Sequence, residues 1–308
     1  MKIGVLGATG FIGGHILNFL SQEGFLCIGF SRSFSGFIND IEIKLCSFDD
    51  NNFNWLDLDF DVLIDCADPP HIQNSISASS DFVQSTISHK KLLMAFAFRY
   101  GVKHYVYLSS AKIFGECSYD LSFNEETPPN PSTSYAHMKL AIEKVLQKES
   151  DGKPLVLSIL RIPFVYGNNG GGSLLALSNI LKTGLWLPFK GVENQRSFLA
   201  VSNLSSFLLS LIRFNGDKSG IWCLSSDESF STSQLFSMMS SSLGLKVVLF
   251  SFPKIFINVF FTVFGKKDLY SKLFENFVVD DSVSRHKLNW SPSECDSQLL
   301  MKFFKDNQ

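Results

Sequence analysis

The sequence predicts an α/β fold in which helices flank a doubly wound parallel sheet, followed by a smaller and mostly helical lobe. Short apolar runs alternate with longer segments of helical spacing in the first half of the chain, and residues 231–308 show helical spacing almost throughout. A length of 308 residues, 45% of them hydrophobic, is enough for about two domains. We therefore expect a sheet domain over residues 1–165, joined by residues 198–225, and a substrate lobe over residues 166–308.

The expected elements follow one another in a regular order. Apolar runs predict strands over residues 3–6, 25–30, 41–45, 61–66, 103–109 and 155–161. Helical spacing predicts helices over residues 11–22, 81–100 and 132–150, and another from residue 173. The very apolar region 246–265 predicts a strand and then a buried helix, with contact with a membrane surface as the alternative. Its longest uninterrupted apolar run is well short of the roughly 20 residues that span a bilayer, so we expect no membrane span.

Composition excludes several classes of function. The net charge is −2 and no run of Lys or Arg stands out, which argues against a nucleic-acid partner. The six cysteines are scattered without a Cys-x-x-Cys pair, so we expect free thiols in a reducing compartment and no metal site. No signal peptide is visible, and a cytoplasmic location is therefore expected.

Three glycines, Gly7, Gly10 and Gly13, follow the first strand at intervals of three. A strand, a glycine turn and a helix place a helix N-terminus at the sheet edge, where its unpaired N–H groups bind a pyrophosphate. An ordinary glycine-rich turn is the alternative, but the position directly after an apolar strand favours a dinucleotide. The expected cofactor contacts in this stretch are Gly7, Thr9, Gly10, Phe11, Ile12 and Gly13.

The ends of the second and fourth strands supply further cofactor contacts. Ser31 and Arg32 stand where an acidic residue would bond the 2′-hydroxyl of the adenosine ribose. A serine and an arginine fit a 2′-phosphate instead, so NADP(H) is preferred and NAD(H) remains possible; a solvated loop arginine is the alternative. Cys66 and Ala67 are small, and they let the chain pass close to the cofactor.

The catalytic candidates come from the fifth strand and the helix after it. Tyr135 and Lys139 are four residues apart and lie on one helix face. A lysine ammonium beside a phenol favours the phenolate and lowers the tyrosine pKa, which prepares Tyr135 to exchange a proton near neutral pH. Ser110, at the end of a strand, is placed to bond the same substrate oxygen. Such a pair alone is most often a solvated helix face, but the preceding glycine turn makes a catalytic pair the better interpretation.

Together these motifs resemble the extended short-chain dehydrogenases/reductases, the NAD(P)-dependent nucleotide-sugar epimerases, dehydratases and reductases with a Rossmann domain. The segments 160–167 and 196–204 add to the resemblance. It implies that Tyr135 is the acid/base, that Lys139 also bonds the nicotinamide ribose and that Ser110 binds the reacting sugar oxygen. It further implies a nicotinamide contact at Pro163 and substrate contacts at Phe164, Tyr166 and Arg196, the arginine pairing with the diphosphate.

Departures from the family pattern narrow the expected chemistry. Ala111 and Lys112 replace the acidic pair that supports water elimination in dehydratases, and no adenine contact is transferred to Ser47 or Phe48. Arg32 favours an enzyme that exchanges NADPH. We therefore expect reduction of the 4-keto group of a dTDP- or UDP-linked 4-keto-6-deoxyhexose, for surface polysaccharide or O-antigen synthesis. A nucleotide-sugar 4-epimerase is the alternative, and a non-catalytic NADP-sensing protein is a lesser one. The resemblance also implies a homodimer formed by helices 81–100 and 132–150.

Overall fold

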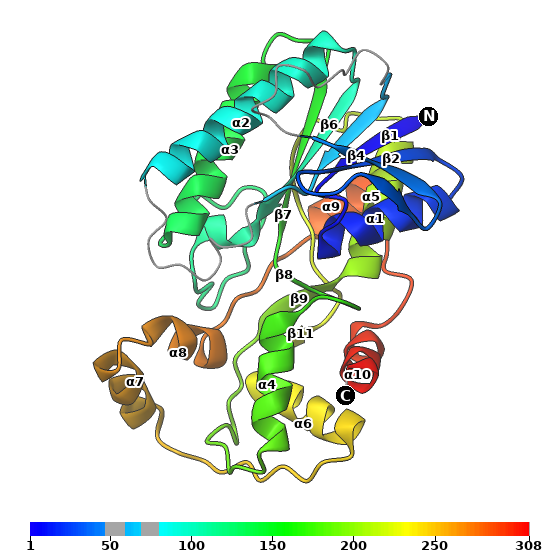
Figure 1. The fold of residues 1–308 in the computed structure, drawn as a ribbon. Coiled ribbons are helices and arrows are strands. Elements are labelled where there is room, and N and C mark those ends of the chain that lie inside the picture. Colours follow the sequence, from blue (N-terminus) through cyan, green and yellow to red (C-terminus); the bar gives the residue numbers. More distant parts are fainter. Residues whose placement is uncertain (47–58, 69–79, 308) are drawn as a thin grey trace.

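The computed structural model describes residues 1–46, 59–68 and 80–307, and within them it shows a large sheet lobe and a smaller lobe (Figure 1). The large sheet has eight strands in the order β10-β7-β6-β5-β1-β2-β4-β3. All neighbours in it are parallel except β3 and β4. The chain leaves β1 first toward β2 and later toward β5, so the sheet is doubly wound as predicted. Ligands of such sheets bind where the winding changes direction, at the carboxyl ends of β1 and β5.

The strands and helices have the following bounds. The large sheet contains β1 (Lys2–Leu6), β2 (Leu26–Ser31), β3 (Gly36–Ile38), β4 (Ile41–Leu45), β5 (Val62–Asp65), β6 (His104–Ser110), β7 (Val156–Ile162) and β10 (Gly220–Cys223). The small sheet contains β8 (Phe164–Tyr166), β9 (Arg196–Ala200) and β11 (Ser229–Phe230). The helices are α1 (Phe11–Gln22), α2 (Ser80–Arg99), α3 (Ser134–Ser150), α4 (Gly172–Lys182), α5 (Val201–Arg213), α6 (Thr232–Leu243), α7 (Lys254–Val263), α8 (Lys267–Phe274), α9 (Ser282–Leu288) and α10 (Asp296–Asp306), with a 3₁₀ turn at Ala111–Phe114.

Helices cover both faces of the large sheet (Figure 1). On one face, α1 and α5 pack together over a core that includes Val5 and Val106. On the other face, α2 and α3 lie side by side over a core that includes Leu6 and Tyr107. Successive strand residues point to opposite faces, so alternate residues of β6 serve different cores. Tyr105 and Tyr107 therefore face the α2/α3 layer.

Residues beyond the first half of the chain also build the large lobe. Strand β10 pairs with β7 at one edge of the sheet, and α5 packs on α1. These contacts place β10 in the large sheet and α5 beside it. The exact bounds of the two domains stay a prediction.

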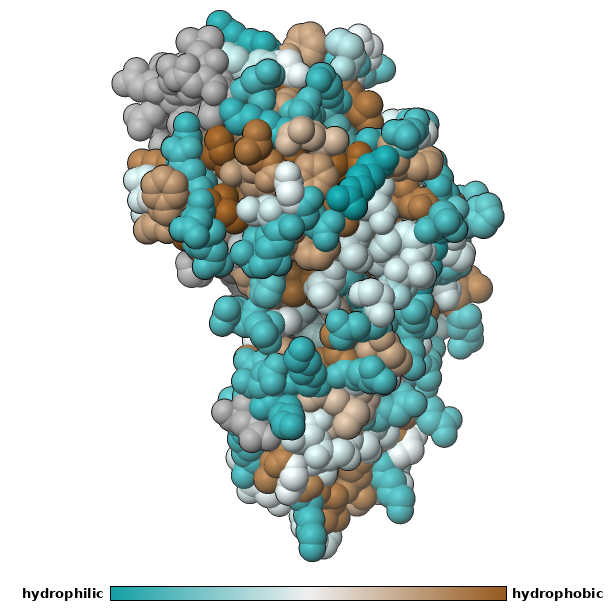
Figure 2. All heavy atoms as spheres, turned by 90° about the vertical axis from the view of Figure 1, so that its right-hand side faces the viewer, coloured by the Kyte–Doolittle hydropathy of each residue, from teal (hydrophilic) through white to brown (hydrophobic). Residues whose placement is uncertain are grey.

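The small lobe has a core rich in aromatic side chains. Phe189, Phe236 and Phe274 pack against one another in it, with Phe189 and Phe236 stacked at a centroid distance of 4.9 Å. The segment 184–189 therefore belongs partly to this core, although Trp186 on the same segment is exposed. Figure 2 shows one face of the molecule, on which hydrophilic side chains and smaller groups of apolar side chains alternate over both lobes.

Two expectations for the C-terminal half and one omission are corrected by the structure. In place of the expected strand after residue 246, an isolated bridge joins Leu249 to Leu187. The expectation of a buried helix is wrong, since Ile257 is the buried residue of α7 and most of this helix faces solvent. The short antiparallel edge strand β3 was not predicted, because its three residues are fewer than the four to eight that a recognisable strand pattern needs. Within the described residues, no helix is long and apolar enough to cross a membrane.

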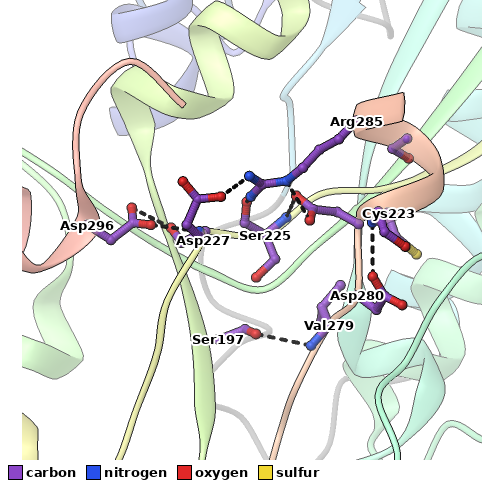
Figure 3. A network of polar contacts seen from close by, with 12 residues as sticks. Ser197, Cys223, Ser225, Asp227, Val279, Asp280, Arg285 and Asp296 are labelled. Atoms are coloured by element: carbon purple, nitrogen blue, oxygen red, sulfur yellow. Dashed lines mark hydrogen bonds and ion pairs between the residues drawn. The ribbon is translucent and has the colours of Figure 1, made fainter. Parts of the chain in front are cut away.

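A polar network fixes the chain where it passes between the lobes (Figure 3). Arg285 of α9 pairs with Asp281 at 2.7 Å and with Asp227, and it donates to the carbonyl of Ser225. Asp296, at the start of α10, accepts from the Ser226 hydroxyl at 2.7 Å and from the Asp227 N–H at 2.8 Å. These bonds hold the segment after β10 against both α9 and α10, so the lobes meet in a defined geometry.

Candidate active site

The glycine turn between β1 and α1 is too tight for other residues. Gly7 has a φ of +75°, and a Cβ there would come within 3.0 Å of the Cys66 carbonyl oxygen. A Cβ on Gly13 would come within 2.3 Å of the Gly7 carbonyl oxygen, and the Gly10 N–H donates to that same oxygen at 2.9 Å. The glycines thus bring the start of α1 against the ends of β1 and β5.

The N-terminus of α1 fits a bound anion. Gly10 is its N-cap, no side chain caps the helix, and its first turn contains no acidic residue. The first N–H groups of a helix have no partner within the helix, and a bound anion can accept from them. A dinucleotide pyrophosphate therefore fits this turn in both shape and charge. Ile12 lies in this first turn and packs on the core behind it.

A hydrogen bond links the glycine turn to the end of β2. The hydroxyl oxygens of Thr9 and Ser31 lie 3.1 Å apart, and Ser31 is buried. The Ser31 hydroxyl also accepts from the Ser33 N–H at 3.3 Å. Arg32 is exposed next to this buried serine, so its guanidinium is open to a charged ligand. The structure thus brings Thr9, Ser31 and Arg32 together, and their contact with a 2′-phosphate stays a prediction.

The Phe11 ring packs against the loop that follows β8. A Cβ on Gly170 would fall 2.3 Å from the Phe11 ring, which shows how closely ring and loop pack. One turn later, His15 approaches the Asn168 carbonyl oxygen at 2.8 Å. The loop therefore closes over the start of α1, and the predicted cofactor contact of Phe11 stays a prediction.

The catalytic candidates lie at the carboxyl end of the large sheet. Strand β6 ends at Ser110, and α3 begins where the Thr133 hydroxyl accepts from the Ala136 N–H at 3.2 Å. This cap places Tyr135 in the first turn of α3 and Lys139 one turn later. Lys139 is 1% exposed and its Nζ donates to the Leu108 carbonyl at 2.6 Å, so α3 is held against β6 close to Ser110.

Lys139 also forms an ion pair that the sequence did not predict. Its Nζ contacts the Asp68 carboxylate, which follows β5, and lies 4.6 Å from the centroid of the Tyr107 ring. The two charged residues are far apart along the chain and follow no motif, so no local signal announces the pair. The predicted catalytic lysine is therefore charge-compensated by a carboxylate at the site itself.

A second lysine–carboxylate pair supports the same turn. Lys90 of α2 lies 2.7 Å from both carboxylate oxygens of Asp65 and donates to the Ala67 carbonyl at 2.6 Å. Tyr105 donates to the same carboxylate at 2.7 Å, and Asp65, Lys90 and Tyr105 are all buried. Buried charges need such complete pairing. This cluster fixes the backbone at Cys66 and Ala67, the two residues predicted to border the cofactor.

Burial sets the protonation of the neighbouring groups. It raises the pKa of the Cys66 thiol, and the Asp65 carboxylate adds to the effect, so the thiol stays protonated. Burial likewise raises the pKa of Tyr107 well above its usual value. Neither group is therefore a proton donor or acceptor near neutral pH. The acid/base role of Tyr135 stays a prediction.

Two predicted substrate residues, Phe164 and Tyr166, lie on β8, directly after the predicted nicotinamide contact Pro163. Pro163 is buried between β7 and β8, and Phe164 is partly exposed with its ring edge-on to Phe198. Tyr166 is 1% exposed, packs on Phe303 and directs its hydroxyl to the Asp296 carbonyl at 3.4 Å. These are contacts of a core residue, and a substrate contact at Tyr166 stays a prediction.

Arg196 lies under the carboxyl end of α8. Its Nη1 donates to the carbonyls of Ser271 and Glu275, both at 3.2 Å, and its guanidinium lies 5.3 Å from the centroid of the Phe277 ring. Burial lowers the Arg196 pKa to about 10, which still leaves the side chain charged at neutral pH. The expected pairing with a substrate diphosphate stays a prediction. Ser47 and Phe48 lie outside the described residues.

Comparison with known proteins now decides the family. The model of the NAD dependent epimerase/dehydratase family matches residues 3–224, a stretch that contains the glycine turn, Ser110, Tyr135 and Lys139. The chain belongs to this family. Within the described residues, no group of three or more His, Cys, Asp or Glu side chains could hold a metal ion.

Individual relatives of the family are distant. The chain is 26% identical to a UDP-glucose 4-epimerase of Vibrio cholerae over 207 residues, which cover 67% of this chain and 62% of that protein. It is 27% identical to a dTDP-D-glucose 4,6-dehydratase of Mus musculus over 107 residues, 35% of this chain and 30% of that protein. Both matches span less than two thirds of the relative's own length.

Solved structures share the whole fold. A UDP-glucose 4-epimerase of Thermotoga maritima with UDP-glucose matches at a TM-score of 0.79 and 20% identity, covering 99% of this chain and 98% of that one. A UDP-glucuronic acid 4-epimerase of Bacillus cereus in complex with NAD matches at a TM-score of 0.76 and 17% identity, covering 100% and 99%. At these identities the likeness establishes the shared fold alone.

Proposed function

We propose that this chain catalyses hydride transfer between a nicotinamide dinucleotide and C4 of a nucleotide-linked hexose, with Tyr135 exchanging the proton of the C4 oxygen. The observation that carries the proposal is the position of Tyr135 and buried Lys139 on one face of α3, held against β6 beside Ser110. The bound dinucleotide would supply or accept the hydride. The family and the epimerases and dehydratases related to it are consistent with chemistry on a nucleotide sugar.

In the reductive direction, each residue has a distinct role. A C–H bond forms at C4 as the carbonyl oxygen takes a proton from the Tyr135 phenol, and solvent then reprotonates the phenolate. The Lys139 ammonium stabilises that phenolate through its positive charge. Ser110 donates a hydrogen bond to the same oxygen and holds the carbonyl in place. In the oxidative direction, the same groups accept the proton from the C4 hydroxyl.

The favoured net reaction is NADPH-dependent reduction of a dTDP- or UDP-linked 4-keto-6-deoxyhexose. Arg32 supports it, because an exposed guanidinium beside the bonded pair Thr9 and Ser31 offers a phosphate ligand where an acid would repel one. A reductase consumes one hydride in each turnover, so it needs a cofactor that it can exchange with the reducing pool. The choice of a 4-keto-6-deoxyhexose as the substrate comes from the family resemblance, and it depends on the proposed C4 chemistry.

A 4-epimerase is the second candidate. It is favoured by the related and structurally similar 4-epimerases, one of which was solved with NAD. An epimerase removes a hydride from C4 and returns it to the other face, so it regenerates its cofactor and NAD suffices. Both candidates use Tyr135, Lys139 and Ser110 in the same way.

One pair of assays separates the candidates. The purified protein is mixed with NADPH and a dTDP- or UDP-linked 4-keto-6-deoxyhexose, and separately with UDP-glucose and a catalytic amount of NAD. Oxidation of one NADPH for each sugar reduced supports the reductase. Interconversion of UDP-glucose and its C4 epimer without net oxidation would replace it by the epimerase. Absence of both reactions with a series of nucleotide sugars would contradict C4 chemistry.

The quaternary structure belongs to the same proposal. Helices α2 and α3 lie side by side on the outer surface of the large lobe, and α2 exposes Leu92 and Phe98 there. Two copies of this helix pair would form a four-helix dimer interface. Sedimentation equilibrium that gives the mass of a monomer over the working concentration range would exclude it.

A further inference from the structure

Helix α7 carries an apolar face that the rest of the described chain leaves uncovered. Six large apolar side chains on α7 and its C-cap are between 56% and 75% exposed: Ile255, Phe256, Val259, Phe260, Val263 and Phe264. Their spacing by one, three and four residues spreads them over about half of the helix circumference. Ile257 and Phe261, on the opposite side, pack on the small-lobe core. The helix is therefore apolar both on the side that packs on the protein and on the side that faces outward.

Positively charged residues flank this face along the chain. Residues 246–272 contain Lys246, Lys254, Lys266, Lys267 and Lys272 against the single acid Asp268, a local excess of four positive charges in a chain whose net charge is −2. Lys254 precedes the apolar stripe, and Lys266 and Lys267 follow it, and all three are exposed. An apolar, aromatic helix face bracketed by lysines complements a lipid surface with anionic headgroups.

The position of α7 leaves it accessible. It lies at the outer side of the small lobe, remote from the large sheet (Figure 1). The helix has 10 residues, too few to cross a bilayer, but enough to lie in the plane of the headgroups. We propose that α7 is a membrane-surface helix, with Phe256 and Phe260 inserted among acyl chains and the flanking lysines on anionic headgroups.

Vesicle flotation tests this proposal with the full chain. The protein is mixed with vesicles of phosphatidylcholine alone and with vesicles that also contain phosphatidylglycerol. We expect flotation with the anionic vesicles and weaker flotation at high salt, since salt screens the lysines. Phe256→Ser with Phe260→Ser should lose flotation, and Lys266→Glu with Lys267→Glu should lose most of it. Phe37→Ser is the matched control, because Phe37 is 72% exposed on the other lobe.

Three outcomes would overturn the proposal. If the wild-type protein floats with neither kind of vesicle, α7 does not bind a lipid surface. Flotation that the Phe256/Phe260 variant retains places binding elsewhere. An oligomer in sedimentation that this variant converts to a smaller species makes the face an interface between copies of the chain. Because all substituted side chains are exposed, circular dichroism should show that every variant folds.

A second inference comes from the ion pair at the site, and it rests on the proposed role of Tyr135. Lys139 has its ammonium on the Leu108 carbonyl and the Asp68 carboxylate, while Tyr135 lies one turn earlier on the same helix face. A negative charge in contact with the ammonium reduces the field that favours the phenolate. We propose that Asp68 is a positioning residue that holds Lys139 and sets the pH range in which Tyr135 exchanges its proton.

The other charged groups around the Lys139–Asp68 ion pair have ion-pair partners of their own. Asp65 is neutralised by Lys90, and Glu143 on the next turn of α3 is neutralised by Arg161. Tyr107 and Cys66 stay protonated. Asp68 is thus the carboxylate that contacts the Lys139 ammonium directly. Among the residues that the structure describes, the groups around the pair are Asp65 at the end of β5, Cys66 and Asp68 after it, Lys90 of α2, Tyr107 of β6, Glu143 of α3 and Arg161 of β7.

Absorbance titration of the cofactor-free protein gives a readout that does not require turnover. The tyrosinate signal that Tyr135→Phe removes reports Tyr135 alone. Asp68→Asn should move this signal to lower pH by about one unit, since the offsetting charge is gone. Asp68→Glu should restore much of the wild-type midpoint. Asp61→Asn is the matched control, because Asp61 forms a 2.7 Å pair with Lys103 near the other end of β5.

The pH profile of kcat should move in the same direction as the titration. An unchanged midpoint in Asp68→Asn, or an equal shift in Asp61→Asn, would overturn the proposal for Asp68. Full turnover by Tyr135→Phe together with a shifted titration would instead overturn the acid/base role of Tyr135 and support the charge coupling. The two failures are therefore distinguishable.

Discussion

Glu143 of α3 and Arg161 of β7 form a buried ion pair in which Nη2 lies 2.7 Å from the carboxylate. Glu143 follows Tyr135 and Lys139 on one face of α3, so the pair fixes that face of the helix to the sheet. Glu143→Gln should leave Arg161 buried without its counter-ion and lower the free energy of unfolding by about 3–5 kcal/mol. Glu149→Gln, on the same helix but paired with exposed Lys91, should cost less than about 1 kcal/mol. Urea denaturation measures both, and equal losses would contradict the assigned role of the buried pair.

Tyr135→Phe tests the proposed acid/base. The variant keeps the ring and removes the hydroxyl, so kcat should fall by about 10²–10⁴-fold. Cofactor affinity, measured by quenching of tryptophan fluorescence, should change little because the glycine turn is untouched. Tyr119→Phe, at an exposed position, is the control and should keep full activity. Wild-type turnover by Tyr135→Phe would remove Tyr135 from its role.

Arg32→Ala tests the preference for NADP(H). Loss of a charged bond to the 2′-phosphate should weaken NADPH binding by about 10–100-fold and leave NADH binding nearly unchanged. The measurement is the dissociation constant of each cofactor. Arg99→Ala removes another exposed arginine, at the end of α2, and should affect neither. Equal weakening of both cofactors by Arg32→Ala would show that Arg32 is not a 2′-phosphate ligand.

The buried His104 should make the protein less stable to unfolding in mild acid. It is buried against the Ser158 hydroxyl at 2.7 Å, and burial, with the charge of Lys218, lowers its pKa from 6.5 to about 4. Between these values the unfolded chain binds a proton that the folded chain excludes, so stability falls as pH drops below 6.5. The loss attributable to His104 should reach about 2 kcal/mol at pH 5.

The control for this effect is His104→Gln, which cannot titrate. Its unfolding free energy should depend less on pH between 7.5 and 5 than that of the wild type, by about the same 2 kcal/mol. Urea titrations at both pH values give the comparison. Identical pH dependence in the two proteins would mean that His104 accepts a proton in the folded state as easily as in the unfolded one.

Local patterns predicted much of the fold and the family motifs. The apolar spacing of residues 11–22 predicted α1 with its observed bounds, and the glycine spacing predicted the turn before it, because both depend on neighbouring residues. The family match confirms that the chain belongs to the NAD dependent epimerase/dehydratase family, which the motifs indicated. The finer assignments, including the reductase and the NADP preference, depend on side chains outside those motifs and stay proposals.

What the sequence could not predict depends on long-range contacts. The pairs of Asp65 with Lys90 and of Asp68 with Lys139 join residues 25 or more positions apart, and no spacing rule links them. Helix α7 shows what local spacing alone leaves undecided. Its apolar spacing indicated a helix correctly, but a period cannot tell whether the apolar face is covered by protein or left outside.

The central claim is hydride transfer at C4 of a nucleotide sugar, and isotope transfer tests it most directly. NADPH with deuterium at the transferred position of the nicotinamide is incubated with the protein and a nucleotide-linked 4-keto-6-deoxyhexose, and the sugar product is examined by NMR. We predict deuterium at C4 of the product of the wild type and almost none with Tyr135→Phe. A reduced sugar with deuterium at another carbon, or without deuterium, would contradict the account.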